Sequence, residues 1–278
     1  MRSLPFPQNL PKPMDAVGTA LPAGNQLGVG ERRFIQHLFD NYITKMGRSD
    51  LIAPNPVINV IRGDDFRTAY RQTYSSGRLK LVRKRLKGLA ANRCTCCGGS
   101  RPAQLDHHLP KTSFGEYAMF IMNLVPSCGE CNQKKSTHAG STEAKAFLHP
   151  YFDPVPNEPY IAVALDIKPG AITAVLSFDN NAAIVNPMIK ARMKNQFNAV
   201  DVNERIEDEV SEFIAEYCDT IEDVLDNPTP EEVIAYLHHA AKRSARRHGE
   251  GSWRAAVLRE LAKNDEFCTG GYSEMLQS

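Results

Sequence analysis

Segments rich in proline alternate with amphipathic patterns in the first part of the chain. Residues 1–30 carry five prolines and several glycines, which disfavour a helix and predict an extended arm. From Glu31 to Met46 the apolar residues recur at helical spacing and predict an amphipathic helix. A loop with two prolines over 47–61 and a short helix over 64–74 are expected next. The predicted inner face of the first helix consists of Phe34, Leu38, Tyr42 and Ile43.

A basic helix is predicted from Gly77 to Ala91, where Lys and Arg interleave with leucines and a valine. Between Arg62 and Arg93 the chain has ten Lys or Arg against two Asp. We therefore expect residues 31–91 to form a helical, basic flank. Its cations are either a solvated helix face or contacts to the phosphates of a nucleic acid. The candidates for phosphate contact are Arg83, Lys84, Arg85 and Lys87.

The pattern over residues 154–278 predicts a β-hairpin followed by a helical region. Apolar and small residues alternate over 160–167 and 171–178, the period of a half-buried strand. The Lys-Pro-Gly triplet at 168–170 predicts the tight turn that joins the two strands.

The helical region begins with one long helix, predicted over 188–218. Thr229 is expected to cap a further helix that runs to about His248. Residues 201–232 hold thirteen Asp or Glu against one Arg, so the net charge of +1 hides a strong segregation of charge. The acidic stretch is either a solvated helix face or a docking surface for a basic partner.

Composition places the chain among cytoplasmic proteins. It has seven cysteines, four of them at metal-binding spacing, which favours a reducing compartment over a disulfide framework. The N-terminus lacks the apolar core of a secretory signal, and no apolar run approaches the ~20 residues of a membrane span. We expect a cytoplasmic location and no membrane partner.

Two Cys-x-x-Cys pairs give the most specific chemical signal. Two thiolates two residues apart can hold one ion from a tight turn, and two such turns complete a tetrahedron. The pairs are separated by 30 residues, which is longer than in a compact zinc ribbon and indicates an inserted element. Cys96 is interpreted as a bystander. The predicted ligands of a structural Zn²⁺ are Cys94, Cys97, Cys128 and Cys131.

The insert predicts a strand, a long loop, a second strand and a helix. Residues 104–111 suit a short strand ended by a proline, residues 123–127 a second strand, and residues 129–137 a polar, basic helix. The expected fold is therefore α+β. It has a zinc-pinned ββα core, a helical N-terminal flank, and a β-hairpin with helices after the core.

This segment of about 46 residues resembles the HNH, or ββα-metal, nucleases. The resemblance implies that Asp106 and Asn132 hold a catalytic Mg²⁺ or Mn²⁺, and that His107 is the general base. It further implies that Asn123 fixes the loop and the orientation of His107, and that Lys135 faces phosphate. The chemistry agrees, because a neutral imidazole can activate water and oxygen ligands suit a hard cation.

The resemblance extends the nuclease core to residues 92–153, since His149 to Asp153 match a segment that often ends such cores. His108 departs from the family pattern, which prefers an apolar residue there, and is interpreted as structural or substrate-facing. His138 is an alternative to Asn132 as a metal ligand, although it lies far from Cys131 for that role.

The predicted function is metal-dependent endonucleolytic cleavage of DNA. The chain resembles HNH nucleases of prokaryotic antiviral defence, such as Septu-type nuclease subunits, which implies a regulated effector with a sensor or ATPase partner. A stand-alone restriction-type nuclease is the nearest alternative. A catalytically inert, zinc-stabilised nucleic-acid-binding module and a structural zinc knuckle are rivals of a different class.

Overall fold

The computed structural model describes residues 1–99, 101–168 and 171–274. The chain divides into two compact units. Unit 1 comprises residues 1–155 and 186–200, and unit 2 comprises residues 156–185 and the chain from Asp201 onward. Each unit combines helices with one two-stranded antiparallel sheet, so the α+β class is confirmed. None of the helices in the described ranges has both the length and the apolar character that a bilayer crossing requires.

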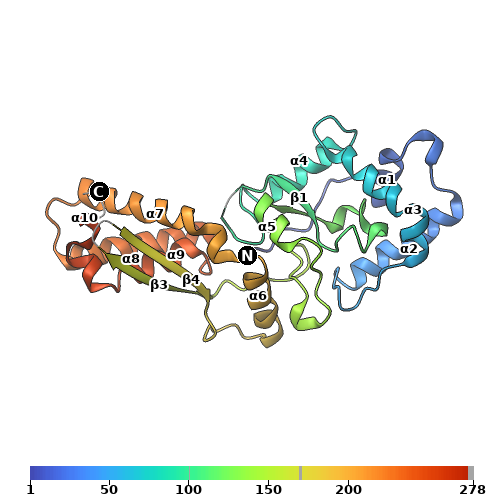
Figure 1. Ribbon diagram of the computed structural model, residues 1–278. Helices are drawn as coiled ribbons and strands as arrows, with labels where there is room; N and C mark the ends of the chain where they lie inside the picture. Colours follow the sequence, from blue (N-terminus) through green and yellow to red (C-terminus); the bar gives the residue numbers. More distant parts are fainter. Residues whose placement is uncertain (100, 169–170, 275–278) are drawn as a thin grey trace. The chain divides into compact units, whose positions relative to one another are not determined.

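Unit 1 surrounds its small sheet with short helices and 3-10 turns (Figure 1). Its sheet consists of β1 (Gln104–His107) and β2 (Leu124–Ser127). Its helices are α1 (Pro13–Ala20), α2 (Val29–Thr44), α3 (Pro56–Ala69), α4 (Lys80–Leu89), α5 (Gly129–Lys135) and α6 (Pro187–Ala199). Its 3-10 turns are η1 (Ala23–Asn25), η2 (Tyr70–Thr73), η3 (Gly115–Tyr117), η4 (Ile121–Asn123) and η5 (Glu143–Lys145).

The predicted order of strand, loop, strand and helix is present in unit 1. β1 and β2 pair antiparallel, with Asp106 opposite Val125 and His107 opposite Leu124. α5 begins directly after β2, because Cys128 occupies the N-cap position with its sulfur accepting from the N–H of Cys131. This register brings the end of β1, where the predicted catalytic residues lie, beside the start of β2.

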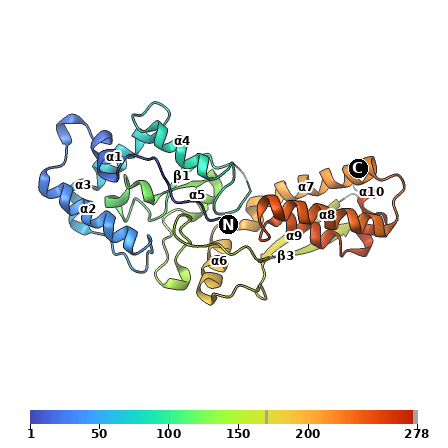
Figure 2. The ribbon, with the colours of Figure 1, turned by 180° about the vertical axis from the view of Figure 1, so that it is seen from behind.

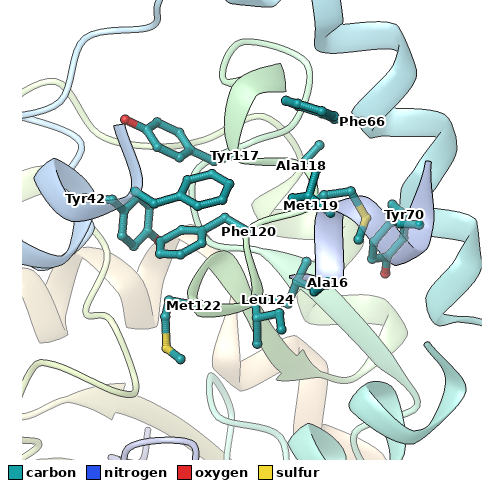
Figure 3. Close-up of a cluster of buried hydrophobic side chains, with 14 of the residues drawn as sticks. Ala16, Tyr42, Phe66, Tyr70, Tyr117, Ala118, Met119, Phe120, Met122 and Leu124 are labelled. Carbon is teal, nitrogen blue, oxygen red and sulfur yellow. The ribbon is translucent and has the colours of Figure 1, made fainter. Parts of the chain in front are cut away.

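The loop between the two strands forms a continuous buried part of the core of unit 1 (Figure 3). Residues 117–124 are all buried, and Phe120 stacks on Phe39 of α2 with ring centroids 4.2 Å apart. Tyr42 meets the edge of Phe120 and the tilted ring of Tyr117. Such aromatic pairs add roughly 0.5–1.5 kcal/mol each beyond the burial of their area. These ring contacts hold the loop against α2.

The N-terminal segment differs from the extended arm expected for residues 1–30. Residues 13–20 form α1, and Ala16, Val17 and Ala20 on its inner face are buried. Pro13 lies in the first turn, where a helix has no need of a backbone N–H, so proline does not disturb it. The proline count therefore misled the prediction, because the position of a proline within a helix decides its effect.

The two following helices also differ in detail from the prediction. α2 buries Ile35, Phe39 and Tyr42, whereas Phe34 is 43% exposed and Ile43 is 36% exposed. α3 starts within the expected loop, because Pro56 suits a first turn and the Asn55 side chain accepts a hydrogen bond from the third residue of the helix.

Unit 2 consists of a hairpin covered by helices (Figure 2). The predicted hairpin is confirmed, and the turn residues 169–170 lie outside the described residues. Thr229 caps its helix as predicted, accepting a hydrogen bond from the N–H of Glu232. Helix α7 packs along β4, and α9 packs along β3. The elements are β3 (Ile161–Lys168), β4 (Ala171–Phe178), α7 (Val202–Val224), α8 (Pro230–His248), α9 (Trp253–Leu261), η6 (Phe267–Gly271) and α10 (Tyr272–Glu274).

The single helix predicted over 188–218 is two helices. Asp201 has a φ of 45°, a left-handed conformation that ends α6 and starts α7. α6 belongs to unit 1, where the guanidinium of Arg192 is buried against both carboxylate oxygens of Asp153 at 2.9 and 2.7 Å. A bidentate buried pair of this kind ties the helix to the end of the predicted nuclease core.

Candidate functional site

Four cysteines converge in unit 1. The Sγ atoms of Cys94, Cys97, Cys128 and Cys131 all lie within 4.8 Å of one another, and all four residues are buried. A tetrahedral Zn²⁺ with Zn–S bonds of about 2.3 Å spaces its sulfur ligands roughly 3.8 Å apart, so the group fits one such ion. The four cysteines could therefore hold a metal ion, consistent with the structural zinc predicted from their spacing. Cys96 is buried beside them and does not belong to the group.

Hydrogen bonds favour the thiolate, the form that binds metal, at two of the four sulfurs, those of Cys94 and Cys128. Hydrogen bonding with the Cys128 thiol instead raises the pKa of Cys97 and of Cys131. The backbone N–H of Cys131 donates to the sulfur of Cys128 at 3.4 Å, and the N–H of Cys128 donates to the sulfur of Cys94 at 3.3 Å. Hydrogen bonding from the neighbouring thiols, first that of Cys128, holds the pKa of Cys94 well below its usual range. Hydrogen bonding from Cys131 lowers the pKa of Cys128 to about 6.

Two contacts fix the ring of His107, the last residue of β1. Its Nε2 lies 3.0 Å from the carbonyl oxygen of Ala118, and its ring centroid lies 4.5 Å from that of Tyr70. A carbonyl can only accept, so we assign the ring hydrogen to Nε2 and the lone pair to Nδ1. Burial lowers the pKa of His107 to about 3, so the imidazole is neutral near pH 7.

An open pocket of about 500 Å³ lies beside this ring, and His107, Asp106 and Asn132 all line it. The three side chains come from β1 and α5, which the antiparallel pairing and the turn after β2 bring together. Asp106 is nearly buried, whereas Asn132 is partly exposed. The remaining wall includes Tyr70, Tyr74, Arg83 and Lys111.

The amide of Asn132 is oriented by a neighbour on β1. Its Nδ2 donates to Oε1 of Gln104, which leaves its oxygen available to an incoming ligand. Asp106, which carries a carboxylate, also lines the pocket. Oxygen donors of these two kinds suit a hard divalent cation such as Mg²⁺ or Mn²⁺.

Lys135 lies where the prediction does not place it. It was expected to face phosphate, but its side chain is buried, with Nζ 3.1 Å from Oδ2 of Asp106 and 2.8 Å from the backbone oxygen of His107. A phosphate backbone needs a cation at the surface, so this ammonium is not a phosphate contact. It neutralises the buried carboxylate instead. Burial raises the pKa of Asp106, and the charge of Lys135 opposes that shift.

Asn123 lies outside the pocket and ties the loop together. Its Oδ1 accepts from the N–H of Leu109 at 2.7 Å and from the hydroxyl of Tyr42 at 2.8 Å. Its Nδ2 donates to the carbonyls of Leu109 and Tyr117 at 3.0 and 3.2 Å. Tyr117 precedes Ala118, whose carbonyl oxygen lies 3.0 Å from Nε2 of His107. By binding the Tyr117 carbonyl, Asn123 therefore holds the turn that carries this acceptor. Asn123 thus holds the loop, and its predicted role in orienting His107 stays a prediction.

The four residues of α4 that are predicted to bind phosphate lie in three different surroundings. Arg83 lines the pocket, and its guanidinium is held by the Thr73 carbonyl and stacks on the Tyr74 ring. Lys84 and Lys87 line a different groove along α4. Arg85 lines neither hollow, and it donates to the backbone carbonyl of Asn9.

The other histidines of the motif lie away from the pocket. His108 is buried with its ring centroid 4.2 Å from that of His149, which agrees with a structural role. His138 is exposed and is not among the residues that line the pocket. The ligand assignment to Asn132 in preference to His138 stays a prediction.

Sequence reasoning missed three residues that shape this site. Tyr70 packs on His107, Lys111 lines the pocket, and Tyr42 holds Asn123. Lys111 lies four residues after the end of β1, within the motif, so its position in the sequence is a signal for a role at the site. Both tyrosines come from elements far away in the sequence. The helical pattern predicts that Tyr42 faces inward, but no local pattern indicates that either tyrosine contacts the site.

Comparison with known proteins adds one short similarity. The chain is 33% identical over 66 residues to protein Ea31 of Escherichia phage lambda, a match that covers 23% of this chain and 22% of that protein. The chain thus spans about a fifth of the length of the curated relative that it matches. No family model matches the chain. No solved structure matches it.

Proposed function

We propose that this protein is a metal-dependent endonuclease of the HNH type that hydrolyses phosphodiester bonds in DNA. The proposal depends above all on the pocket that Asp106, His107 and Asn132 share within one ββα segment. A volume of about 500 Å³ is that of an ordinary ligand site and leaves room for a phosphate with its flanking sugars. The cysteine group at the end of the same segment supports the proposal, because it matches the zinc knuckles of many HNH nucleases.

His107 would act as the general base through Nδ1, which would take a proton from the attacking water. Its Nε2–H would stay bonded to the Ala118 carbonyl, which keeps the ring in one orientation during the transfer. The low pKa of the buried imidazole would rise when a phosphate enters the pocket, since a nearby anion favours the protonated form. This coupling would strengthen the base only when substrate is present.

Asp106 and Asn132 would hold the catalytic Mg²⁺ or Mn²⁺ through oxygen atoms. When bound, this cation would neutralise the charge that develops on the phosphate and on the leaving oxygen. Arg83 and Lys111, which also line the pocket, would add positive charge. A role in prokaryotic antiviral defence beside a sensor or ATPase partner stays a prediction.

The test is a nicking assay on supercoiled plasmid with zinc-loaded protein. We expect nicked and then linear DNA when Mg²⁺ or Mn²⁺ is added, and no product without either ion. A parallel reaction with labelled RNA distinguishes the two substrates. Intact DNA and intact RNA with both ions, under conditions in which the protein binds them, would contradict the proposal.

One observation favours a second candidate, a zinc-stabilised nucleic-acid-binding module without catalysis. The carboxylate of Asp106 is already paired with the ammonium of Lys135 inside the protein, and this pair competes with metal binding. Isothermal titration with Mn²⁺ separates the candidates. Binding that is lost in Asp106→Asn supports the nuclease, whereas the absence of binding in the wild-type protein supports the module.

A further inference from the structure

A second hollow in unit 1, here called the α4 groove, has a volume of about 430 Å³. It lies along α4 and is bordered by the end of η2 and by the segment that follows the first cysteine pair. Five of its lining residues are cations, and none of the described lining residues is acidic. The residues are Thr73, Ser75, Lys80, Arg83, Lys84, Lys87, Gly88, Asn92, Arg101 and Pro102.

Helical periodicity explains why the cations gather. Lys80, Lys84 and Lys87 follow one another at intervals of four and three residues, so they share one face of α4. The buried positions Val82 and Leu86 turn the other face of the helix to the core. Arg101 approaches from a separate segment and adds its charge to the groove. The result is a concave cationic surface.

The charges of the α4 groove are not balanced by acidic neighbours. Within the described part of the chain, no carboxylate lies within ion-pairing distance of Lys80, Lys84 or Lys87. Burial lowers the pKa of Lys87, and the charges of Arg83 and Arg101 lower it further, so the cations lie close enough to repel one another. An anion that enters the groove removes this repulsion, and on a polyanion it also releases counterions.

Arg83 joins the α4 groove to the candidate site, because it lines both hollows. Its guanidinium is held in place by the Thr73 carbonyl at 3.1 Å and by the Tyr70 hydroxyl at 3.1 Å. An arginine fixed in this way can contact an anion without losing much side-chain freedom. A nucleic-acid strand that leaves the pocket on the side of Arg83 would therefore enter the α4 groove.

We propose that the α4 groove binds the phosphates that flank the reacting phosphate on one side. The reacting phosphate itself would occupy the pocket. Seven helical steps of about 1.5 Å separate Lys80 and Lys87 by roughly 10 Å. One strand of B-DNA advances about 3.4 Å per nucleotide, so the groove spans roughly three nucleotides. The inference rests on the proposed function for the placement of the reacting phosphate, and it adds Lys80 and Arg101 to the binding surface.

Binding without cleavage tests the groove by itself. Zinc-loaded protein is titrated, with no Mg²⁺ or Mn²⁺ added, into fluorescent oligonucleotides that share a short core. One set carries three added nucleotides on the 5′ side, and another carries them on the 3′ side. Affinity is measured by anisotropy at several salt concentrations. We expect one of the two extensions to raise the affinity and to steepen its salt dependence.

The variants Lys80→Ala and Lys84→Ala are expected to lose the gain from that extension. Each should make the slope of log K against log salt shallower by about 0.7 for a single strand. The matched control is Arg85→Ala on the same helix, since Arg85 is equally basic and lines neither hollow. It is expected to keep the wild-type gain and slope.

The outcomes separate this inference from the proposed function. Binding that depends on Lys80 and Lys84, in a protein that cleaves nothing, supports the groove and contradicts the nuclease. Cleavage with the same oligonucleotide affinity and salt slope in all three variants supports the nuclease and overturns the groove. No affinity of the wild-type protein for any of the oligonucleotides also overturns the groove.

Discussion

Lys135 places its ammonium 3.1 Å from the carboxylate of Asp106, and the two side chains are only 3% and 7% exposed. The pair joins α5 to β1 inside unit 1. The same ammonium also donates to the backbone oxygen of His107 at 2.8 Å. One buried cation thus supports two residues of the candidate site, and its removal leaves a carboxylate with little access to water.

Lys135→Met is expected to lower the free energy of unfolding by about 3–5 kcal/mol, because it leaves a buried charge without its partner. Urea unfolding measures this loss. The matched control is Lys134→Met, one residue away on the exposed side of α5, for which we expect a small change. If Asp106 is a metal ligand, added Mn²⁺ should stabilise Lys135→Met more than the wild-type protein. Equal stability of the two variants would contradict the structural role of Lys135.

The hydrogen bond from Tyr42 to Asn123 gives a second prediction. In Tyr42→Phe the Asn123 oxygen loses one of its two donors, so stability should fall by about 1 kcal/mol. Because Asn123 holds the turn that orients His107, we also expect a lower kcat with little change in KM. Tyr236→Phe is the control, since this tyrosine lies on α8 of unit 2 and does not line the pocket. A change in KM alone would argue against positioning.

The cysteine assignment predicts different outcomes for neighbouring thiols. Cys94→Ser should lower the zinc content below one ion per chain and leave unit 1 unfolded or insoluble, since structural zinc supplies folding free energy. Cys96→Ser should keep the zinc and the fold, because Cys96 lies outside the group of four. Elemental analysis and circular dichroism report both. Full zinc content in Cys94→Ser would show that the ligand set is wrong.

Stability should fall when the pH is lowered from 7 to 5. Burial lowers the pKa of His149 to about 3, whereas an unfolded histidine titrates near 6.5. The stabilising contribution of the neutral ring is complete above pH 6.5 and is lost as the pH falls toward 3, at up to about 1.4 kcal/mol per unit. The buried rings of His107 and His108 act in the same direction.

The variant His149→Gln isolates one of these titrations. The slope of the free energy of unfolding against pH measures how many protons are taken up on unfolding. Between pH 6.5 and the acid limit of folding, this number should be smaller by about one in His149→Gln than in the wild-type protein. Zinc content is measured at each pH, because acid also protonates metal-binding thiols. A pH dependence identical to that of the wild-type protein would show that His149 does not carry this effect.

Features whose physical cause lies in neighbouring residues could be predicted from the sequence. The β3–β4 hairpin follows from alternating apolar residues, and the cap of α8 follows from Thr229 before Pro230. The Cys-x-x-Cys spacing predicted that the two cysteine pairs converge, because each pair can supply two of the four ligands of a tetrahedral ion. The order of β1, β2 and α5 followed from the same segment.

Features that depend on distant partners could not be predicted. The burial of Lys135 requires the carboxylate that β1 presents to α5, and a basic helix pattern gives no sign of it. The break at Asp201 separates α6, which Arg192 joins to Asp153 in unit 1, from α7 in unit 2, and no local pattern indicates this contact. Tyr42 reaches Asn123 across 81 residues. In each case tertiary packing determines the role of a residue that local patterns leave open.

The most direct test of the central claim compares the plasmid nicking rate of His107→Ala with that of His37→Ala, an exposed histidine on α2. Both variants must first match the wild-type zinc content and circular dichroism spectrum. We predict that His107→Ala is slower by about a hundredfold or more, as expected for the loss of a general base, and that His37→Ala nicks at the wild-type rate. A folded, zinc-loaded His107→Ala that nicks DNA as fast as the wild-type protein would contradict the account.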